Sequence, residues 1–115
     1  MKRDMELIRL LLLEVEEEDT PDLSQYPEQQ QLYHMILLIE AELVKGEVID
    51  GEDGSACSAH ATRLTWRGHE FLDAARNPSV WKQVSDKLKS AGASLPLPII
   101  QEMLISVLKK QVGLE

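Results

Sequence analysis

The stretch from Arg63 to Arg76 constrains the fold of this chain more than any other part of the sequence. Thr65 is a good helix N-cap, because its hydroxyl can accept a hydrogen bond from a free N–H of the first helical turn. A single helical stripe follows at the spacing i, i+3, i+4, i+7, formed by Gly68, Phe71, Leu72 and Ala75. Since Gly68 has no side chain, another element can approach the helix closely there. The stretch therefore predicts a strand that runs directly into a helix.

Two helices are predicted before this stretch. The first covers residues 4–18, and the Asp/Thr/Pro-containing segment after it ends the helix. The second covers residues 27–45, because Pro27 suits a first helical position and Gly46 suits a C-cap. Residues 23–26 lie between the two helices and are predicted as a brief strand.

A hairpin and two further helices complete the prediction. Residues 47–49 form a strand, residues 50–55 carry two Asp/Gly turn signals, and the return strand lies within residues 58–64. Asn77 caps a helix that has Pro78 at its first position and is closed by Gly92, and a last helix begins near Pro96 or Pro98 and runs to about Val112. The predicted core joins apolar stripes of three helices: Met5, Ile8, Leu12, Leu32, Ile36, Ile39, Leu43, Phe71 and Leu72.

This order of elements resembles a winged helix-turn-helix domain with extra C-terminal helices. The fold class is therefore predicted as mainly α with a small β-hairpin, in one domain over residues 1–115. Residues 1–76 would form the winged-helix core, and residues 77–115 a helical extension. One departure from the usual order is that the middle helix of the triad is missing, or reduced to residues 23–26, which affects the usual geometry of docking on DNA.

Three blocks of the sequence resemble a family of small uncharacterised proteins from bacteria and their phages and prophages. They are residues 1–9, residues 33–41 with Tyr33-His34 and Leu37 to Ala41, and residues 64–76, and the similarity continues through Trp81-Lys82. The resemblance covers most of the chain and implies architecture and origin. It implies no activity and supplies no functional residues.

Composition indicates where the protein is expected to reside and which partners its surface suits. The chain has 115 residues and one cysteine, Cys57, so an internal disulfide cannot form and a reducing, cytoplasmic location is expected. No apolar run approaches the length of a membrane span. Residues 1–60 hold four Lys/Arg against fifteen Asp/Glu, a balance of −11, whereas residues 61–115 hold eight against five, a balance of +3. The acidic half is a poor surface for nucleic acid.

DNA binding is the alternative function that the resemblance to a winged helix suggests. The 27–45 helix would read bases and the 47–63 hairpin would be the wing, with a candidate recognition face of Gln30, Gln31, His34, Leu38 and Lys45. Phosphate contacts require Lys and Arg, and Lys45 is the only basic residue between Leu10 and Arg63. A basic side formed by arginines and lysines after residue 62 is better explained as a solvated helix face.

Metal binding and catalysis have little support in the sequence. Cys57 and His60 have ligand-like spacing with His69 downstream, but a zinc site normally takes four ligands and no second close pair is present. The acidic turn at residues 50–54 lacks the calcium-loop pattern. No nucleophile with a base, and no phosphate-binding glycine loop, is recognisable. No catalytic residue, metal or cofactor is predicted, and Trp66 and Trp81 are expected to be packing residues.

The predicted function is a non-enzymatic, winged-helix-like module that binds another protein or regulates it. A homodimer is also predicted, because the last helix is apolar around most of its circumference and the first helix carries apolar residues on its charged side. The candidate oligomer interface consists of Leu10, Leu13, Ile99, Met103 and Ile105.

Overall fold

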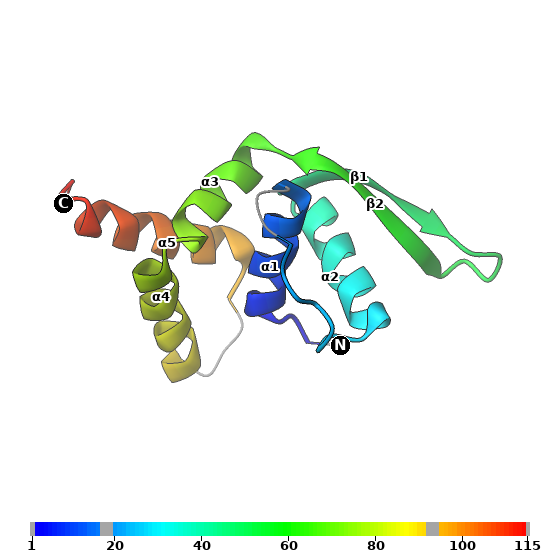
Figure 1. Cartoon of the computed structure of the whole chain (residues 1–115), viewed down its shortest axis with the longest axis horizontal. Helices are drawn as coiled ribbons and strands as arrows, with labels where there is room; N and C mark the ends of the chain where they lie inside the picture. The colour runs from blue at the N-terminus through cyan, green and yellow to red at the C-terminus, as the bar shows by residue number, and fades with distance from the viewer. Residues whose placement is uncertain (1, 17–19, 92–94, 115) are drawn as a thin grey trace. The chain divides into compact units, whose positions relative to one another are not determined.

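The computed structural model describes residues 2–16, 20–91 and 95–114. Their elements, in chain order, are α1 (Met5–Glu16), α2 (Glu28–Glu40), β1 (Val44–Asp50), β2 (Ala56–Leu64), α3 (Trp66–Ala75), α4 (Pro78–Ala91) and α5 (Leu97–Gln111). This mainly helical chain with one antiparallel hairpin is compatible with a winged-helix-like arrangement and confirms the predicted fold class (Figure 1).

Contacts along the backbone group the chain into two compact units, Met1–His69 and Glu70–Glu115. The first unit holds α1, α2, the hairpin and the first turn of α3. The second unit holds the rest of α3 together with α4 and α5.

Helix α1 begins at a capped end that is tied to α2. The Asp4 carboxylate accepts hydrogen bonds from the backbone N–H groups of Glu6 at 3.0 Å and Leu7 at 3.2 Å, which is the role of an N-cap residue. The Asp4 backbone N–H in turn donates to Nε2 of His34 at 2.7 Å. Four residues of α1 are buried, namely Leu7, Ile8, Leu11 and Leu12. Predicted helix residues 17 and 18 lie outside the described residues.

Helix α2 ends at Glu40, five residues before the predicted end. Glu42 adopts a left-handed backbone conformation with φ 61°. Its N–H donates to the Ile39 carbonyl and the Leu43 N–H donates to the Leu38 carbonyl, which is the hydrogen-bond pattern of a Schellman cap. Strand β1 therefore starts at Val44, before the predicted position, because Glu42 and not Gly46 turns the chain out of the helix.

We expect Glu42→Gly to raise the free energy of unfolding by roughly 0.5–1 kcal/mol. A left-handed conformation costs an L-residue about 1–2 kcal/mol, and the greater freedom of glycine in the unfolded chain offsets part of that gain. Urea unfolding followed by circular dichroism would measure the change. Glu40→Gly is the matched control, because Glu40 is the last residue of the helix and has no left-handed conformation for glycine to relieve, so stability should fall by up to about 1 kcal/mol.

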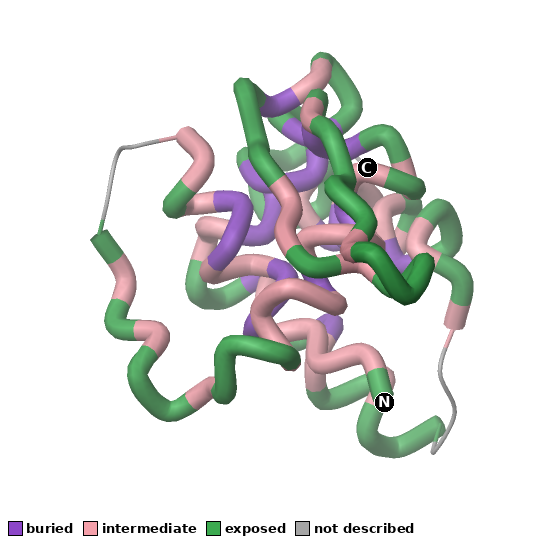
Figure 2. Tube along the Cα trace, turned by 90° about the vertical axis from the view of Figure 1, so that its right-hand side faces the viewer, coloured by how far each residue is buried: buried purple, intermediate pink, exposed green. Residues whose placement is uncertain are grey.

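The hairpin pairs β1 with β2 in a register that contains two bulges. Val44 pairs with Leu64 and Lys45 with Arg63, whereas Gly46 pairs with Ala61, so Thr62 is extra on β2. A second register shift, between the pairs Ile49–Ser58 and Asp50–Ala56, leaves Cys57 extra on β2. Strand β2 begins at Ala56, two residues before the predicted return strand. Both strands are mostly exposed or half-buried beyond their base (Figure 2).

The prediction of a strand at residues 23–26 is wrong. The Tyr26 N–H donates to the Leu23 carbonyl at 2.9 Å, which closes a turn. The Gln31 side-chain amide donates to the carbonyls of both Leu23 and Tyr26 and fastens this turn to α2. Within the described residues the sheet has two strands, so a strand at this position would have no partner to pair with.

The junction of β2 and α3 confirms the sequence prediction in detail. The Gly68 N–H donates to the Thr65 hydroxyl oxygen at 3.0 Å, so Thr65 is the N-cap of α3. The same hydroxyl donates to the Glu42 carbonyl at 2.6 Å, and the Thr65 N–H donates to the Leu43 carbonyl at 3.0 Å. A Cβ on Gly68 would lie 2.0 Å from the Leu43 carbonyl oxygen, so only glycine allows this approach.

The second unit is built from apolar faces of its three helices. Asn77 caps α4, because its side-chain oxygen accepts from the N–H groups of Ser79 and Val80 at 3.1 and 3.2 Å, as predicted. Helices α4 and α5 contact each other. The buried residues of this unit are Phe71, Leu72, Ala74, Ala75, Val80, Val84, Ile100, Leu104 and Val107. The predicted closing glycine of α4, Gly92, lies outside the described residues.

The predicted core is correct for α3 and for two of its three α1 residues, but wrong for α2. Ile8, Leu12, Leu43, Phe71 and Leu72 are buried, whereas Met5 and the three α2 residues of the predicted stripe are only half-buried: Leu32, Ile36 and Ile39. The buried side chains of α2 are His34 and Leu38. Apolar residues cover most of the circumference of α2, so the pattern did not fix which side faces inward.

Candidate functional site

The first unit carries an open groove of about 620 Å³ between three elements. One wall comes from α1, a second from α2 and a third from four consecutive residues of β2. The lining residues are Leu11, Glu14, Glu28, Gln29, Gln31, Leu32, Met35, Ala56, Cys57, Ser58 and Ala59. The volume lies in the range typical of ligand-binding pockets, about 300–1,000 Å³.

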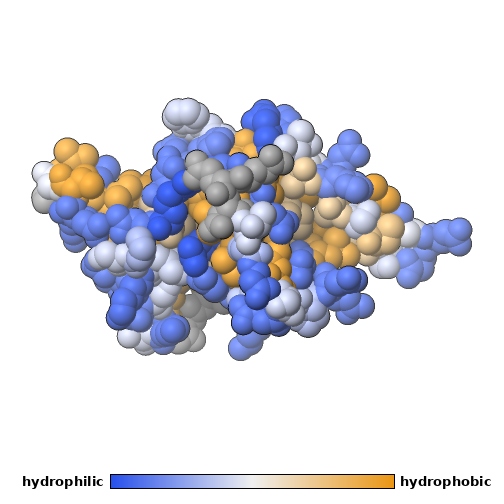
Figure 3. All heavy atoms as spheres, in the orientation of Figure 1, coloured by the Kyte–Doolittle hydropathy of each residue, from blue (hydrophilic) through white to orange (hydrophobic). Residues whose placement is uncertain are grey.

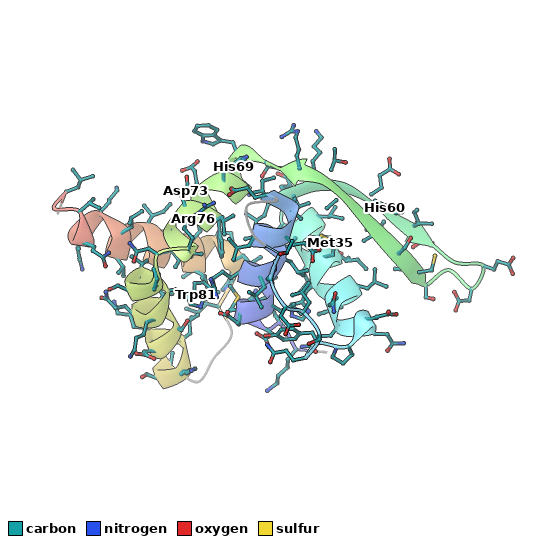
Figure 4. All side chains as sticks on the ribbon, viewed as in Figure 1. Met35, His60, His69, Asp73, Arg76 and Trp81 are labelled. Carbon is teal, nitrogen blue, oxygen red and sulfur yellow. The ribbon has the colours of Figure 1, made fainter. Side chains whose placement is uncertain are left out.

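Polar and apolar side chains both line the groove. The more buried ones, which we call its floor, are mainly apolar, and two of the exposed ones, at its rim, are acidic. Leu32 and Met35 are half-buried on α2, where Figure 4 labels Met35, and Ala59 is half-buried on β2. The charged residues that line the groove are both carboxylates, Glu14 and Glu28, and both are exposed. On the face shown in Figure 3, hydrophobic residues lie beside hydrophilic ones over α2 and the base of the hairpin.

The local fold explains how these residues come together. Helix α2 starts at Glu28, directly after its N-cap Pro27, whose φ of −58° suits a helix start. Glu28 stands in the first turn, where the helix dipole favours a negative charge. The bulge at Cys57 interrupts the alternation of side chains along β2. Four successive residues of β2 consequently line the groove, where a regular strand would present every second residue.

The tip of the hairpin extends the acidic character of this unit. Glu47, Asp50, Glu52 and Asp53 are all exposed. The hydroxyl of Ser55 donates to the Asp53 carboxylate at 2.7 Å and the Ser55 N–H donates at 3.0 Å. These two hydrogen bonds, the one from the hydroxyl above all, lower the pKa of Asp53 below its ordinary value, so this carboxyl stays ionised at neutral pH.

The structure does not present the predicted recognition face as one exposed surface. His34 and Leu38 are fully buried, so the prediction is wrong for both. His34 is buried because both ring nitrogens are satisfied. Since Nε2 accepts the Asp4 N–H, Nδ1 carries the proton and donates to the Gln30 carbonyl at 2.8 Å. His34 therefore joins the start of α1 to α2.

The other three residues of that face differ in position and in the contacts that they make. Gln30 is half-buried, and the Gln31 side chain holds the 23–26 turn while it lines the groove. Lys45 is exposed but lies in β1, opposite Arg63, because α2 ends before it. Of the five predicted residues, only Gln31 belongs to the groove.

The residues of the candidate oligomer interface are divided between the two units. Leu10 and Leu13 are half-buried on α1, in the first unit. Ile99 is 43% exposed and Met103 and Ile105 are half-buried on α5, in the second unit. The dimer stays a prediction.

The histidines and the cysteine considered as metal ligands lie in separate environments. Cys57 lines the groove, His60 pairs with Glu47 in the hairpin, and His69 Nδ1 lies 3.5 Å from a Glu16 carboxylate oxygen. Figure 4 labels His60 on β2 and His69 on α3. Within residues 2–16, 20–91 and 95–114, no group of three or more His, Cys, Asp or Glu is placed to hold a metal ion.

Trp66 was expected to pack and is instead 79% exposed. It is the first residue of α3 and lies two positions before Gly68, about 200° around the helix from the buried stripe. Because the buried stripe faces the interior, the Trp66 side chain points away from it. Trp81, on α4, is half-buried.

The sequence did not reveal the groove, although its parts were visible. Leu32 was assigned to the predicted core stripe, and Ala56 and Cys57 were placed before the return strand. The usable signal was the apolar excess of α2, which has more apolar side chains than one buried stripe needs. The burial of His34 decides which of these apolar side chains stay accessible. Local spacing in the sequence does not encode that burial.

Comparisons with known proteins agree on a family but give no activity. A family model described as "Hypothetical protein (DUF2513)" matches residues 2–94. A Haemophilus influenzae protein described as "Uncharacterized protein" is 33% identical over 120 residues, which cover 98% of this chain and all of that protein. None of the solved structures compared with the chain matches it. Among the described residues, no helix combines the length and apolar character needed to cross a membrane.

Proposed function

This chain belongs to the family described as "Hypothetical protein (DUF2513)", and on that premise we propose that it is a non-enzymatic protein-interaction module. Its binding site is the groove between α1, α2 and β2. The ligand is a segment of a protein that carries apolar side chains next to lysine or arginine. The module acts by binding, and its own residues carry out no chemistry.

The character of the groove is the observation that carries this proposal. An open groove with an apolar floor offers burial to side chains such as Leu or Val, at roughly 25 cal/mol for each Å² removed from water. Glu14 and Glu28 on the rim add attraction for a cation and reject acidic ligands. Open grooves between helices and strands are a common mode of peptide recognition.

The alternative, a DNA-binding regulator that uses the 27–45 helix and the 47–63 wing, has weaker support. The sequence of α2 contains no Lys or Arg, and its residues His34 and Leu38 are buried. The hairpin would bring four carboxylates toward phosphates. Since phosphate neutralisation by Lys and Arg dominates affinity for DNA, this surface is unsuited to the duplex.

We expect no submicromolar binding to duplex DNA even at low salt, because like charges on the hairpin tip and the −11 balance of residues 1–60 oppose it. Fluorescence anisotropy with labelled duplexes of mixed sequence measures this directly. Tight binding that weakens steeply as salt is added would contradict the prediction and favour the regulator.

Selection from a library of displayed random peptides tests the proposed function. Cys57 lines the groove, is exposed and is the only cysteine of the chain, so a bulky maleimide on its sulfur blocks the groove selectively. We expect the enriched peptides to combine apolar residues with Lys or Arg. They should bind the unmodified chain and lose at least about tenfold in affinity once Cys57 is labelled.

Two controls define what this selection means. A small maleimide, N-methylmaleimide, reacts with the same sulfur but leaves most of the groove open, so it should weaken binding much less than the bulky reagent. Peptides that bind the blocked chain as tightly as the open chain would place the interaction elsewhere. A selection that enriches no peptide would refute the proposed function.

A further inference from the structure

The end of α5 carries an exposed apolar pair beside two lysines. Val112 is 59% exposed and Leu114 is 73% exposed, which makes them, after Trp66, the most exposed large apolar side chains among the described residues. Lys109 and Lys110 in the last turn of α5 are exposed as well. Apolar side chains grouped in this way on a surface mark a contact site more often than single exposed ones do.

Hydrogen bonds hold the backbone of this segment in a defined conformation. Gly113 has φ 82°, its N–H donates to the Lys110 carbonyl at 3.2 Å, and the Leu114 N–H donates to the Lys109 carbonyl at 2.8 Å. This is a Schellman cap, in which glycine takes the left-handed position without strain. The segment Lys109–Leu114, which we call the α5 tip, is therefore an ordered feature, and ordering it on binding costs little entropy.

The α5 tip and the groove are complementary in both charge and polarity. The tip offers two cations, two apolar side chains and no carboxylate between residues 109 and 114, whereas the groove offers an apolar floor and two carboxylates. The two surfaces belong to different units of the chain, the groove to Met1–His69 and the tip to Glu70–Glu115. Residues 1–60, which contain the groove, have a charge balance of −11, and residues 61–115, which contain the tip, have a balance of +3. Each surface therefore has the same sign of charge as the half of the sequence that carries it.

We propose that the groove of one copy of this chain binds the α5 tip of a second copy. Val112 and Leu114 enter the groove over Leu32 and Met35, and Lys109 and Lys110 pair with Glu14 and Glu28 on its rim. If both copies exchange their tips, the two contacts are equivalent and the assembly closes as a two-fold dimer. The inference rests on the proposed function, since it names the partner of the same groove.

Charge reversal in two full-length variants tests the inference. Glu14→Lys with Glu28→Lys reverses the groove, and Lys109→Glu with Lys110→Glu reverses the tip. All four side chains are exposed, so the fold should persist, and circular dichroism verifies this. In the groove variant alone, both the groove and the tip are basic, and in the tip variant alone, both are acidic. Mixed in equal amounts, the two variants have opposite charges at both contacts.

Sedimentation velocity gives the readout. We expect the wild-type chain to shift with rising micromolar concentration from 13.0 kDa toward twice that mass. Each variant alone should dissociate with a Kd raised at least about tenfold, and the equimolar mixture should regain the association. Glu47→Lys with Glu52→Lys is the matched control, because it changes the charge equally at exposed positions outside the groove and should leave the dimer intact.

Three results would overturn the inference: a wild-type chain that stays at 13.0 kDa, variants that dimerise as the wild type does, or a mixture that fails to associate. None of them touches the proposed function, which the selected peptides test separately. A groove that binds foreign basic peptides while the chain stays monomeric would uphold the proposed function and refute the second copy as its partner.

Discussion

Phe71→Ala should lower the free energy of unfolding by about 3–5 kcal/mol, the largest loss expected from a single side chain of this protein. Phe71 lies on α3, has no exposed surface and is among the largest fully buried side chains. Its removal forfeits the transfer free energy of the ring and leaves a cavity. Its neighbours Leu72, Ala74 and Ala75 are buried too, and the two alanines are too small to fill that space.

Urea unfolding followed by circular dichroism measures the loss. Glu70→Ala is the matched control, because it lies next to Phe71 on the same helix but is exposed, and its effect should stay within about 0.5 kcal/mol. A loss below about 1 kcal/mol for Phe71→Ala would mean that the ring does not anchor α3 in solution.

Gly68→Ala should destabilise the protein by about 3 kcal/mol, although alanine is the better helix former. Helix propensity alone favours the substitution by about 1 kcal/mol. The new Cβ, however, would lie 2.0 Å from the Leu43 carbonyl oxygen and 3.0 Å from its carbon. Both are backbone atoms and cannot rotate away, so α3 must shift, at the upper end of the 1–3 kcal/mol typical of overpacking or beyond it.

The shift would also break hydrogen bonds at the same junction. Thr65 donates its N–H to the Leu43 carbonyl and its hydroxyl to the Glu42 carbonyl, each worth about 1 kcal/mol. Gly51→Ala is the control, because its nearest contact would be an ordinary 3.4 Å, and its effect should stay below about 1 kcal/mol. If Gly68→Ala unfolds at the same denaturant concentration as the wild type or a higher one, the close approach to Leu43 does not persist in solution.

Local chemistry in the sequence was sufficient to predict the starts of helices. Thr65 and Asn77 cap the helices that they were predicted to cap, since an N-cap depends on a side chain and on backbone groups two or three residues away. The end of α2 was predicted less well. Glu42, a residue with no preference for the left-handed region, occupies the position for which Gly46 was expected.

The candidate site was less predictable than the fold, because it depends on distant contacts. The burial of His34 requires the Asp4 N–H, thirty positions away, and nothing in the pattern of α2 shows that this donor is there. With His34 turned inward, Leu32 and Met35 stay accessible and become the floor of the groove. A polar residue that is satisfied in the interior thus changed which side of the helix is most deeply buried.

The two bulges of the hairpin also limit how another chain could pair with its edges. A two-stranded sheet leaves an unpaired edge on each strand, and Val48 and Ile49 are 37% and 42% exposed near the middle of it. A long flat edge of this kind is a template for intermolecular β-aggregation. The bulges at Cys57 and Thr62 confine the regular ladder to the four pairs that Gly46–Ile49 form with Ser58–Ala61, and they increase the twist at both ends. The bulges therefore shorten the regular edge with which a strand of another chain could pair.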